Sequence, residues 1–445
     1  MTTATLDYTY DYAFASRVDD ERIQLATCGG RLASGQFFHG SLRHPRVIGD
    51  LLRVLATVVR THFFQPGPPD LDPVVTSSPA MLRFEGFSGC SSAYARVDLD
   101  ERAFRAAEQT FGTTNVDFND PMRRELGRLR EGEQVELSVG REAVELRRGE
   151  QTVRERKVKL PIRWIKAFGE VQVYQSQLVR ALETPAGELR RFLHTLPRSS
   201  RQMTYVVQTG RTIRLSGRPA RGAVPIHGAE RLRVLQPLLP HAERLVVWLE
   251  PDSGASAWQI LTPAGSLLLL VSPELYRGFS GEGQLLEKLA VGDWQAALPS
   301  VQALLDWQTT LDPAEIAART GHRVAQVEAA LAVLGARGLA GFDASAGFYF
   351  HRRLPFDLDK VEQLQPRLRN ARKLLEAGGV RVVEQPGDDA WDVEVQGTGV
   401  AHFVRLRPDG DRCTCPWFSK HQGARGPCKH VLAARMFVEN AGEGS

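Results

Sequence analysis

The chain is poor in cysteine and has no long apolar run. Only five of its 445 residues are Cys, and Cys28 and Cys90 stand far from each other and from the rest. This usage argues against a disulfide framework and fits a reducing compartment. No apolar stretch reaches the length of a membrane span, and the first residues lack a basic region followed by an apolar run. We therefore expect a cytoplasmic protein without membrane contact.

Lysine is also scarce, and the charge balance is close to neutral. Of 56 basic residues only eight are Lys, so 48 are Arg, and the formal net charge is +4. That charge is well below the charge of proteins that wrap nucleic acid around their surface, although arginine favours phosphate contact. The charge thus permits a nucleic-acid partner without demanding one. A hydrophobic fraction of 42% with 24% charged residues is ordinary for a globular protein of two to four domains.

Apolar spacing predicts an α+β multidomain fold. Residues 47–64 have helical spacing and 156–182 are also helix-like, while the chain between them and the stretch 203–270 carry short strand-like runs. These strands are predicted at 81–85, 93–99, 135–139, 143–147, 245–249 and 267–271. We expect four domains: an α+β domain at 1–180, a strand-rich α+β domain at 181–295, a winged-helix-like domain at 300–356, and a connecting helix with a zinc finger at 360–445.

The winged-helix-like stretch is predicted from the order of its elements. A helix starts after Thr310, a turn follows at Thr320, a second helix spans 324–334, and a small hairpin ends near Phe350. The second helix carries Arg323 and otherwise mostly Ala, Val and Leu, whose side chains form no hydrogen bonds to base edges. A structural or protein-docking role is therefore favoured over DNA reading.

The strongest functional signal lies near the carboxyl end, where Cys413 and Cys415 are followed by Cys428 and His430. Two cysteines at i and i+2 on a strand face the same side, and Cys428 and His430 stand where a loop enters a short helix. Three thiolates and one imidazole suit tetrahedral Zn²⁺, and four ligands leave no position open for substrate. The pattern predicts one structural zinc.

This spacing resembles the SWIM zinc finger, whose pattern is C-x-C, a variable spacer, then C-x-H. The spacer here is the twelve residues from Pro416 to Pro427. The resemblance implies a strand hairpin with a short helix, and binding of DNA or a protein. It also suggests bacterial relatives that work beside MoxR-type ATPases and von Willebrand A-type proteins.

Basic and aromatic residues around the ligands are candidates for contact with nucleic acid or a partner: Arg412, Trp417, Lys420, Arg425 and Lys429. Two interpretations stay open. The basic residues either contact phosphate, with Trp417 stacking on an unpaired base, or balance thiolate charge while Trp417 caps the small core. His421, inside the spacer, is a rival ligand that would have to displace His430.

We favour a non-catalytic adaptor, and the alternative is an enzyme whose site lies in residues 80–295. A deep cleft lined by Asp98, Asp117 and Asn119 would favour the enzyme. Asp and Asn in such runs more often bond their own backbone in turns, and Cys90 has no assignable base beside it. The sequence does not name a partner, a reaction or an oligomeric state.

Overall fold

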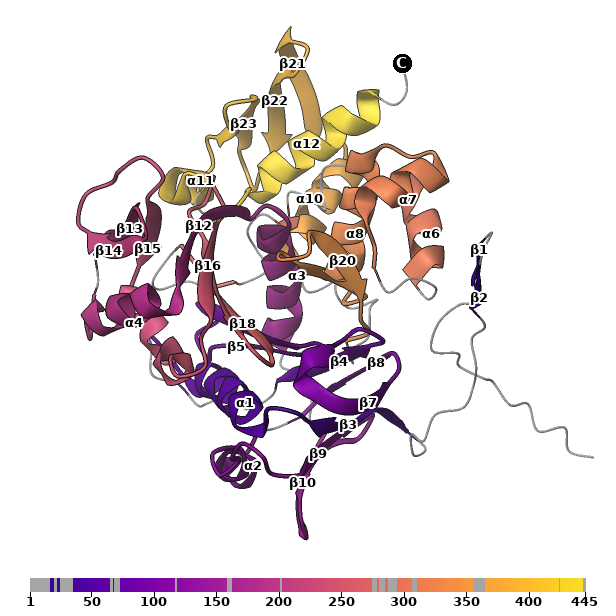
Figure 1. The fold of residues 1–445 in the computed structure, drawn as a ribbon. Helices are drawn as coiled ribbons and strands as arrows, with labels where there is room; N and C mark the ends of the chain where they lie inside the picture. The colour runs from indigo at the N-terminus through magenta and orange to yellow at the C-terminus, as the bar shows by residue number, and fades with distance from the viewer. Residues whose placement is uncertain are drawn as a thin grey trace, which may run out of the picture.

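The computed structural model places the elements in the arrangement of Figure 1. The residues that it describes are 17–19, 22–24, 35–64, 67, 73–116, 118–157, 162–200, 202–273, 278–279, 285–286, 294–305, 310–354, 365–423 and 425–442. A short hairpin of β1 (Arg17–Asp19) and β2 (Arg22–Gln24) comes first. Among the described helices, none combines the length and apolar character needed to cross a membrane.

The largest sheet has eight antiparallel strands in the order β12-β16-β17-β18-β6-β5-β4-β8. They are β4 (Val74–Ser78), β5 (Met81–Phe87), β6 (Ala93–Leu99), β8 (Gly112–Asn115), β12 (Val179–Pro185), β16 (Arg244–Leu249), β17 (Ser256–Thr262) and β18 (Gly265–Val271). The strands predicted at 81–85, 93–99, 245–249 and 267–271 are present. The sheet takes strands from both sides of residue 180, so the stretches 1–180 and 181–295 share one core.

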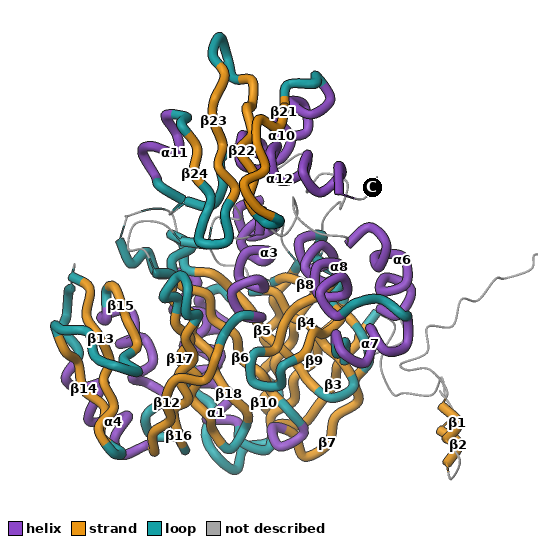
Figure 2. The backbone as a smooth tube through the Cα atoms, turned by 90° about the horizontal axis from the view of Figure 1, so that it is seen from above, coloured by secondary structure: helices purple, strands orange, loops and turns teal. Residues whose placement is uncertain are grey.

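A five-stranded sheet in the order β11-β10-β9-β3-β7 lies beside it (Figure 2). Its strands are β3 (Gln36–Leu42), β7 (Phe104–Gln109), β9 (Val135–Gly140), β10 (Ala143–Arg148) and β11 (Gln151–Arg156), with η1 (Glu101–Ala103) and α2 (Asp120–Leu126) between them. The alternating burial along β9 confirms the half-buried strand that the sequence predicts there.

Helices cover both faces of the eight-stranded sheet. Helix α1 (Pro45–Arg60) starts with Pro at its first position and buries an apolar face against β5 and β6. On the other face, α3 (Ile162–Ser176) places Trp164 and Phe168 against Phe87, with ring centroids 5.5 and 5.0 Å away. The helical stretch predicted at 156–182 is too long, because β12 begins at Val179 as an edge strand of the sheet.

A smaller lobe packs at the β12 end of the sheet (Figure 1). It contains α4 (Ala186–Thr195) and an antiparallel sheet in the order β14-β13-β15. Its strands are β13 (Met203–Thr209), β14 (Thr212–Ser216) and β15 (Val224–His227), followed by η2 (Ala229–Leu238).

The predicted helix, turn, helix and hairpin are all present in the next unit. Its elements are α6 (Trp294–Leu305), α7 (Pro313–Thr320), α8 (Val324–Ala336), β19 (Ala340–Asp343) and β20 (Phe348–His351). Asp312 caps α7 by accepting hydrogen bonds from two backbone amides, and Gly321 ends the helix at a φ of 75°. A bridge between Leu311 and Tyr349 ties the start of the unit to its hairpin.

This hairpin docks on the charged face of β5 and β6 through a buried network of six ionised side chains. Arg83 and Arg96 both bond the carboxylates of Asp98 and Asp343, which lie on opposite sides of the interface. A second group pairs Arg352 of the hairpin segment with Glu85, at 2.8 Å.

The whole network is electrically neutral, because Arg83, Arg96 and Arg352 balance Glu85, Asp98 and Asp343. All six side chains are at least nine-tenths buried. Burial alone would raise the pKa of Asp343, but the guanidiniums of Arg96 and Arg83 hold that pKa well below its usual range.

The carboxyl-terminal domain has its own core. It contains α10 (Pro366–Glu376), β21 (Val380–Gly387), β22 (Ala390–Gln396), β23 (Ala401–Leu406), β24 (Arg412–Cys413), α11 (Pro416–His421) and α12 (Lys429–Gly442). The strands pair in sequence order, and α10 packs against α12. The predicted hairpin with a short helix is therefore only part of a larger α+β domain.

Replacing Asp343 by Asn should lower the free energy of unfolding by about 3–5 kcal/mol, because two buried guanidiniums lose a carboxylate. The pKa of Asp343 is depressed in the folded state. The carboxylate of Asp343 therefore makes its full contribution to the free energy of unfolding above about pH 4 and loses it as the pH falls further. Urea unfolding at several pH values measures both effects. The control Asp388→Asn, in the exposed turn after β21, should change stability by less than about 0.5 kcal/mol. Equal losses in the two variants would contradict this role for Asp343.

Candidate metal centre

Cys413 and Cys415 reach the centre from two different elements. Cys413 ends β24, which pairs with β23 through Val404, so its position is fixed by the sheet. Cys415 was expected on the same strand, but it is the N-cap of α11, where its sulfur accepts a hydrogen bond from the amide of Phe418. The expectation of one continuous strand is wrong, because Pro416 at the first helical position starts a helix at once.

Cys428 and His430 lie at the start of α12, as the sequence predicts. The helix follows Gly426 and Pro427, and its apolar residues pack into the domain core, which anchors both ligands. It is longer than the predicted short helix, because α12 continues to Gly442 along β22 and β23.

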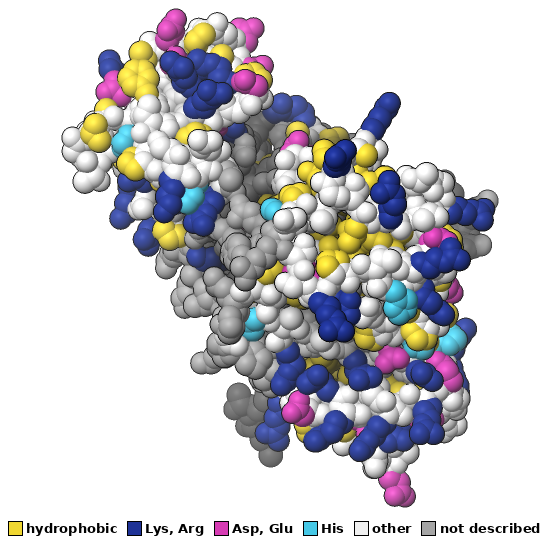
Figure 3. Space-filling view, turned by 90° about the vertical axis from the view of Figure 1, so that its left-hand side faces the viewer, with side chains coloured by type: hydrophobic (Ala, Val, Ile, Leu, Met, Phe, Trp, Pro, Cys, Tyr) yellow, Lys and Arg dark blue, Asp and Glu magenta, His cyan; other side chains and the backbone are white. Residues whose placement is uncertain are grey.

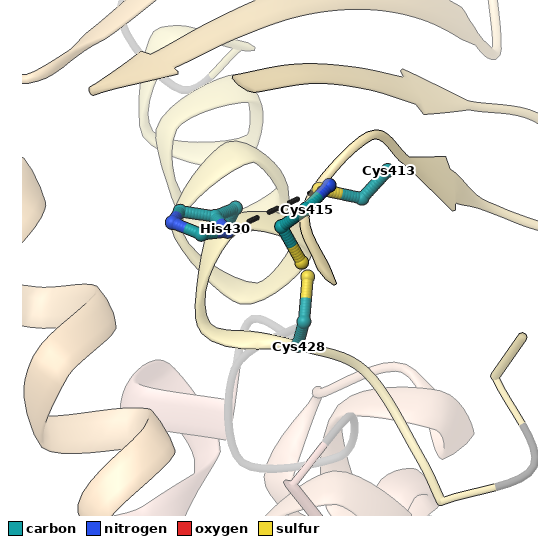
Figure 4. A group of neighbouring side chains, drawn as sticks. All are labelled: Cys413, Cys415, Cys428 and His430. Carbon is teal, nitrogen blue, oxygen red and sulfur yellow. Dashed lines mark hydrogen bonds between the residues drawn. The ribbon is translucent and has the colours of Figure 1, made fainter. Parts of the chain in front are cut away.

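The four side chains converge on one point (Figure 4). Their ligand atoms all lie within 4.8 Å of one another, and all four residues are buried. Zinc–sulfur bonds of about 2.3 Å in a tetrahedron put neighbouring sulfurs about 3.8 Å apart, so the cluster is of the right size for one ion. The ring nitrogen of His430 that faces the thiols is Nδ1, at 3.9 Å from Cys413 Sγ.

Backbone amides already point at the sulfurs. Cys413 Sγ accepts from the amide of Cys415, and Cys428 Sγ accepts from the amide of Val431, each at 3.4 Å. Donors aimed at a sulfur stabilise the thiolate that a metal requires. The donor set therefore fits a tetrahedral Zn²⁺, for which Cys413, Cys415, Cys428 and His430 would be the ligands.

Before metal binds, the thiols share protons unevenly. A hydrogen bond from the Cys413 thiol lowers the pKa of Cys428 to about 4. The same contact raises the pKa of Cys413 far above its usual range. Burial raises the pKa of Cys415 as well, so metal binding must release protons from this group of thiols.

The predicted contact residues lie around this centre with unequal exposure. Arg412, Lys420 and Arg425 are exposed, and Lys429 is half-buried between two ligands. Trp417 is half-buried, because the guanidinium of Arg367 lies 4.6 Å from the centroid of its ring. This arrangement matches the interpretation in which Trp417 caps the core over the metal.

The rival ligand His421 is not part of the cluster. Its ring lies 4.9 Å from that of Trp417, at the end of α11. The sequence reasoning missed two residues that the structure brings to this region. Arg367, from α10, donates to the carbonyls of Arg425 and Pro427, and the ring of His402 lies 4.4 Å from that of His430.

Two residues of the alternative, catalytic interpretation have local structural partners. Both oxygens of Asp98 bond Arg83 and Arg96 inside the ionic network. Asn119 caps α2 and donates to Glu155, which is the local role that such residues usually have. Asp117 lies outside the described residues.

Comparison with known proteins identifies the carboxyl-terminal segment. Residues 402–434 match the model of the SWIM zinc finger, and this range includes all four ligands. No curated protein matches the chain. Among solved structures, it is similar to the crystal structure of Proliferating Cellular Nuclear Antigen from Entamoeba histolytica, with 11% identity and a TM-score of 0.38. That match covers 54% of this chain and all of the other, and a TM-score this low does not establish a shared fold.

Metal analysis of the purified protein should find about one zinc per chain. Replacing Cys413 and Cys415 by Ser should abolish it, because a hydroxyl is not a comparable soft ligand. The matched control is Cys90→Ser, which removes a half-buried thiol far from the cluster and should leave zinc content unchanged. Full zinc retention in the double variant would remove the assignment.

Chelation should loosen the carboxyl-terminal domain and leave the eight-stranded sheet intact. The metal supplies folding energy to a domain whose own apolar core is small, so amide exchange should rise across 366–442, including α10. Hydrogen-exchange mass spectrometry with and without chelator tests this. Uniform loosening of the whole chain would show that the two cores do not unfold separately.

Proposed function

Because residues 402–434 form a SWIM zinc finger whose thiolates and imidazole bind Zn²⁺, we propose that the chain is a non-catalytic adaptor whose finger binds a nucleic-acid backbone. The observation that carries this proposal is the outer face of the finger sheet. That face turns away from α10 and α12, and it carries an exposed aromatic ring beside two unpaired arginines.

The two arginines lie directly opposite each other. Arg405 on β23 pairs in register with Arg412 on β24, and both are exposed. Like charges in such a cross-strand pair repel each other, and a bound anion would remove that cost. Among the described residues, Asp392, which lies opposite Arg405 on β22, bonds Arg407, and Glu394 on the same face bonds Arg381.

Phe403 completes the face. Its side chain is 46% exposed on the same side of β23 as Arg405. An open ring beside cationic side chains is the arrangement that stacks on an unpaired base while phosphates are held nearby. Phe403 is better placed for this than Trp417, because Arg367 already covers the indole.

The spacer extends the same basic surface. Lys420 lies on α11, which contacts β24, and Arg425 follows on the connection to α12. Neither has an ion pair among the described residues. We therefore place the phosphate contacts on Arg405, Arg412, Lys420 and Arg425, and we assign Lys429 to charge balance at the metal.

We propose a winged-helix-like unit in the 310–354 segment, with a docking role instead of a DNA-reading one. Helix α8 packs on α3, where Gln172 donates to the carbonyl of Leu331 at 3.3 Å. The remaining face of α8 borders a cavity of about 440 Å³, which Val324, Ala325 and Glu328 help to line. An apolar and acidic wall repels phosphate and suits a protein segment. A MoxR-type ATPase or a von Willebrand A-type protein, as the resemblance suggests, is the partner we propose for it.

Changing Arg405, Lys420 and Arg425 to Gln should leave zinc bound but weaken nucleic-acid binding across sequences. The logarithm of the binding constant should fall less steeply with the logarithm of salt, by about 0.7–0.9 for each lost phosphate contact. Fluorescence anisotropy with labelled single- and double-stranded DNA over a salt series measures this slope. Arg412 and Lys429 are kept, because each adjoins a ligand and its replacement would confuse binding with metal loss.

The matched control replaces Arg105, Arg147 and Arg319, which are exposed on β7, β10 and α7. It removes the same charge and should leave the slope unchanged. If the wild-type chain shows no salt-dependent association with either DNA at low ionic strength, the phosphate interpretation fails. The finger would then be a protein-docking module.

A further inference from the structure

One stretch of the chain is far more basic than the whole. Residues 189–229 contain eight Arg and no Asp, Glu or Lys. The segment therefore carries +8, whereas the whole chain carries +4. The rest of the chain is thus net acidic, at −4. An asymmetry of this size indicates a local electrostatic function.

The structure gathers these arginines in the lobe of α4 and β13–β15, which we call the arginine lobe. Helix α4 contacts β14, so both parts of the segment belong to one lobe. Figure 3 looks at this side of the molecule, where Lys and Arg side chains are spread widely. Arg201 lies outside the described residues.

Six arginine side chains of the lobe are exposed and have no ion pair among the described residues. They are Arg190, Arg198, Arg211, Arg214, Arg218 and Arg221. Nearby arginines are different: Arg191 bonds Glu188, and Arg233 donates to the carbonyl of Leu196. Six such cations on one small lobe repel one another, and a polyanion relieves that repulsion.

The lobe is a firm platform for these charges. Its inner face buries Val206, Ile213, Val224 and Ile226 against the main core. The register that pairs Val207 with Arg214 turns the arginine to the opposite, outer side.

We propose that the arginine lobe binds the phosphate backbone of a nucleic acid. This inference rests on the proposed function, because it supplies a second contact for the same kind of partner. Nucleic-acid interfaces are polar and strongly positive, whereas protein interfaces have an apolar centre. The only large hydrophobic side chain that is exposed among the described residues of the lobe is Met203, at 36%. Hydroxyls of Thr209 and Thr212 on the same outer side as Arg214 add donors suited to phosphate oxygens.

The arginine lobe and the finger lie on the same side of the molecule. In Figures 1 and 2, α11 and the sheet of β13–β15 are both on the left. One strand or duplex that is long enough can therefore touch both surfaces. The lobe packs on the main core and contains none of the four metal ligands, so its contact does not depend on zinc.

The test compares three triple variants of the full chain. The lobe variant carries Arg211→Gln, Arg214→Gln and Arg218→Gln, and the other two are the finger triple and the control triple described above. Each variant is titrated with a labelled DNA duplex of about 30 base pairs at several salt concentrations, and the binding constant is measured at each. The lobe variant should flatten the salt slope by about 2–3 units, at about 0.9 per lost contact, and the control triple should not.

Zinc chelation separates this proposal from the proposed function. In chelator, wild-type protein should keep the slope that depends on the lobe and lose the slope that depends on the finger. If only the lobe variant changes the slope, the proposed phosphate contact of the finger is wrong and that of the lobe is supported. If only the finger variant does, or if the control triple flattens the slope equally, the lobe proposal is overturned. If the wild-type protein binds poly-glutamate but not DNA, the lobe proposal is also overturned, in favour of an acidic protein partner.

Discussion

The position of the 310–354 unit depends on the buried network that Arg83, Arg96 and Arg352 form with three carboxylates. Removing six ionised groups from water costs much more free energy than a solvent-exposed ion pair provides. Each buried charge therefore needs an opposite charge at hydrogen-bonding distance. Only one docked position of the β19–β20 hairpin provides this, since Asp343 must meet two guanidiniums at once. The network therefore specifies one arrangement, and that arrangement holds α8 against α3.

The finger meets the same need for specificity by a different interaction. Its core is small, and its outer strands are polar, so a metal with four ligands takes the place of the missing apolar area. The amides that point at Cys413 and Cys428 belong to the turns that bring the ligands together. Because zinc fixes the inner side of the sheet, the outer side with Phe403 and Arg405 is free for binding.

Sequence reasoning reached what local patterns encode. The ligand spacing identified Cys413, Cys428 and His430 in their correct elements, and helical periodicity identified α1. It failed where tertiary context decides. The alternating charges of β5 and β6 are typical of a solvated face, yet a hairpin about 250 residues away in the chain covers that face. Cys415 was assigned to a strand, because the pattern does not show that Pro416 begins a helix.

Net charge was the least informative of the sequence quantities, for a physical reason. A protein's field at a binding surface depends on charges within about 10 Å, which is the screening length near 0.1 M salt. The value of +4 is the sum of a segment at +8 and a remainder at −4, and a ligand meets these two regions separately. A mildly basic total therefore says little about whether the chain binds a polyanion. The relevant quantity is how many arginines of one region are exposed without an ion pair, and among the described residues the arginine lobe carries six of them.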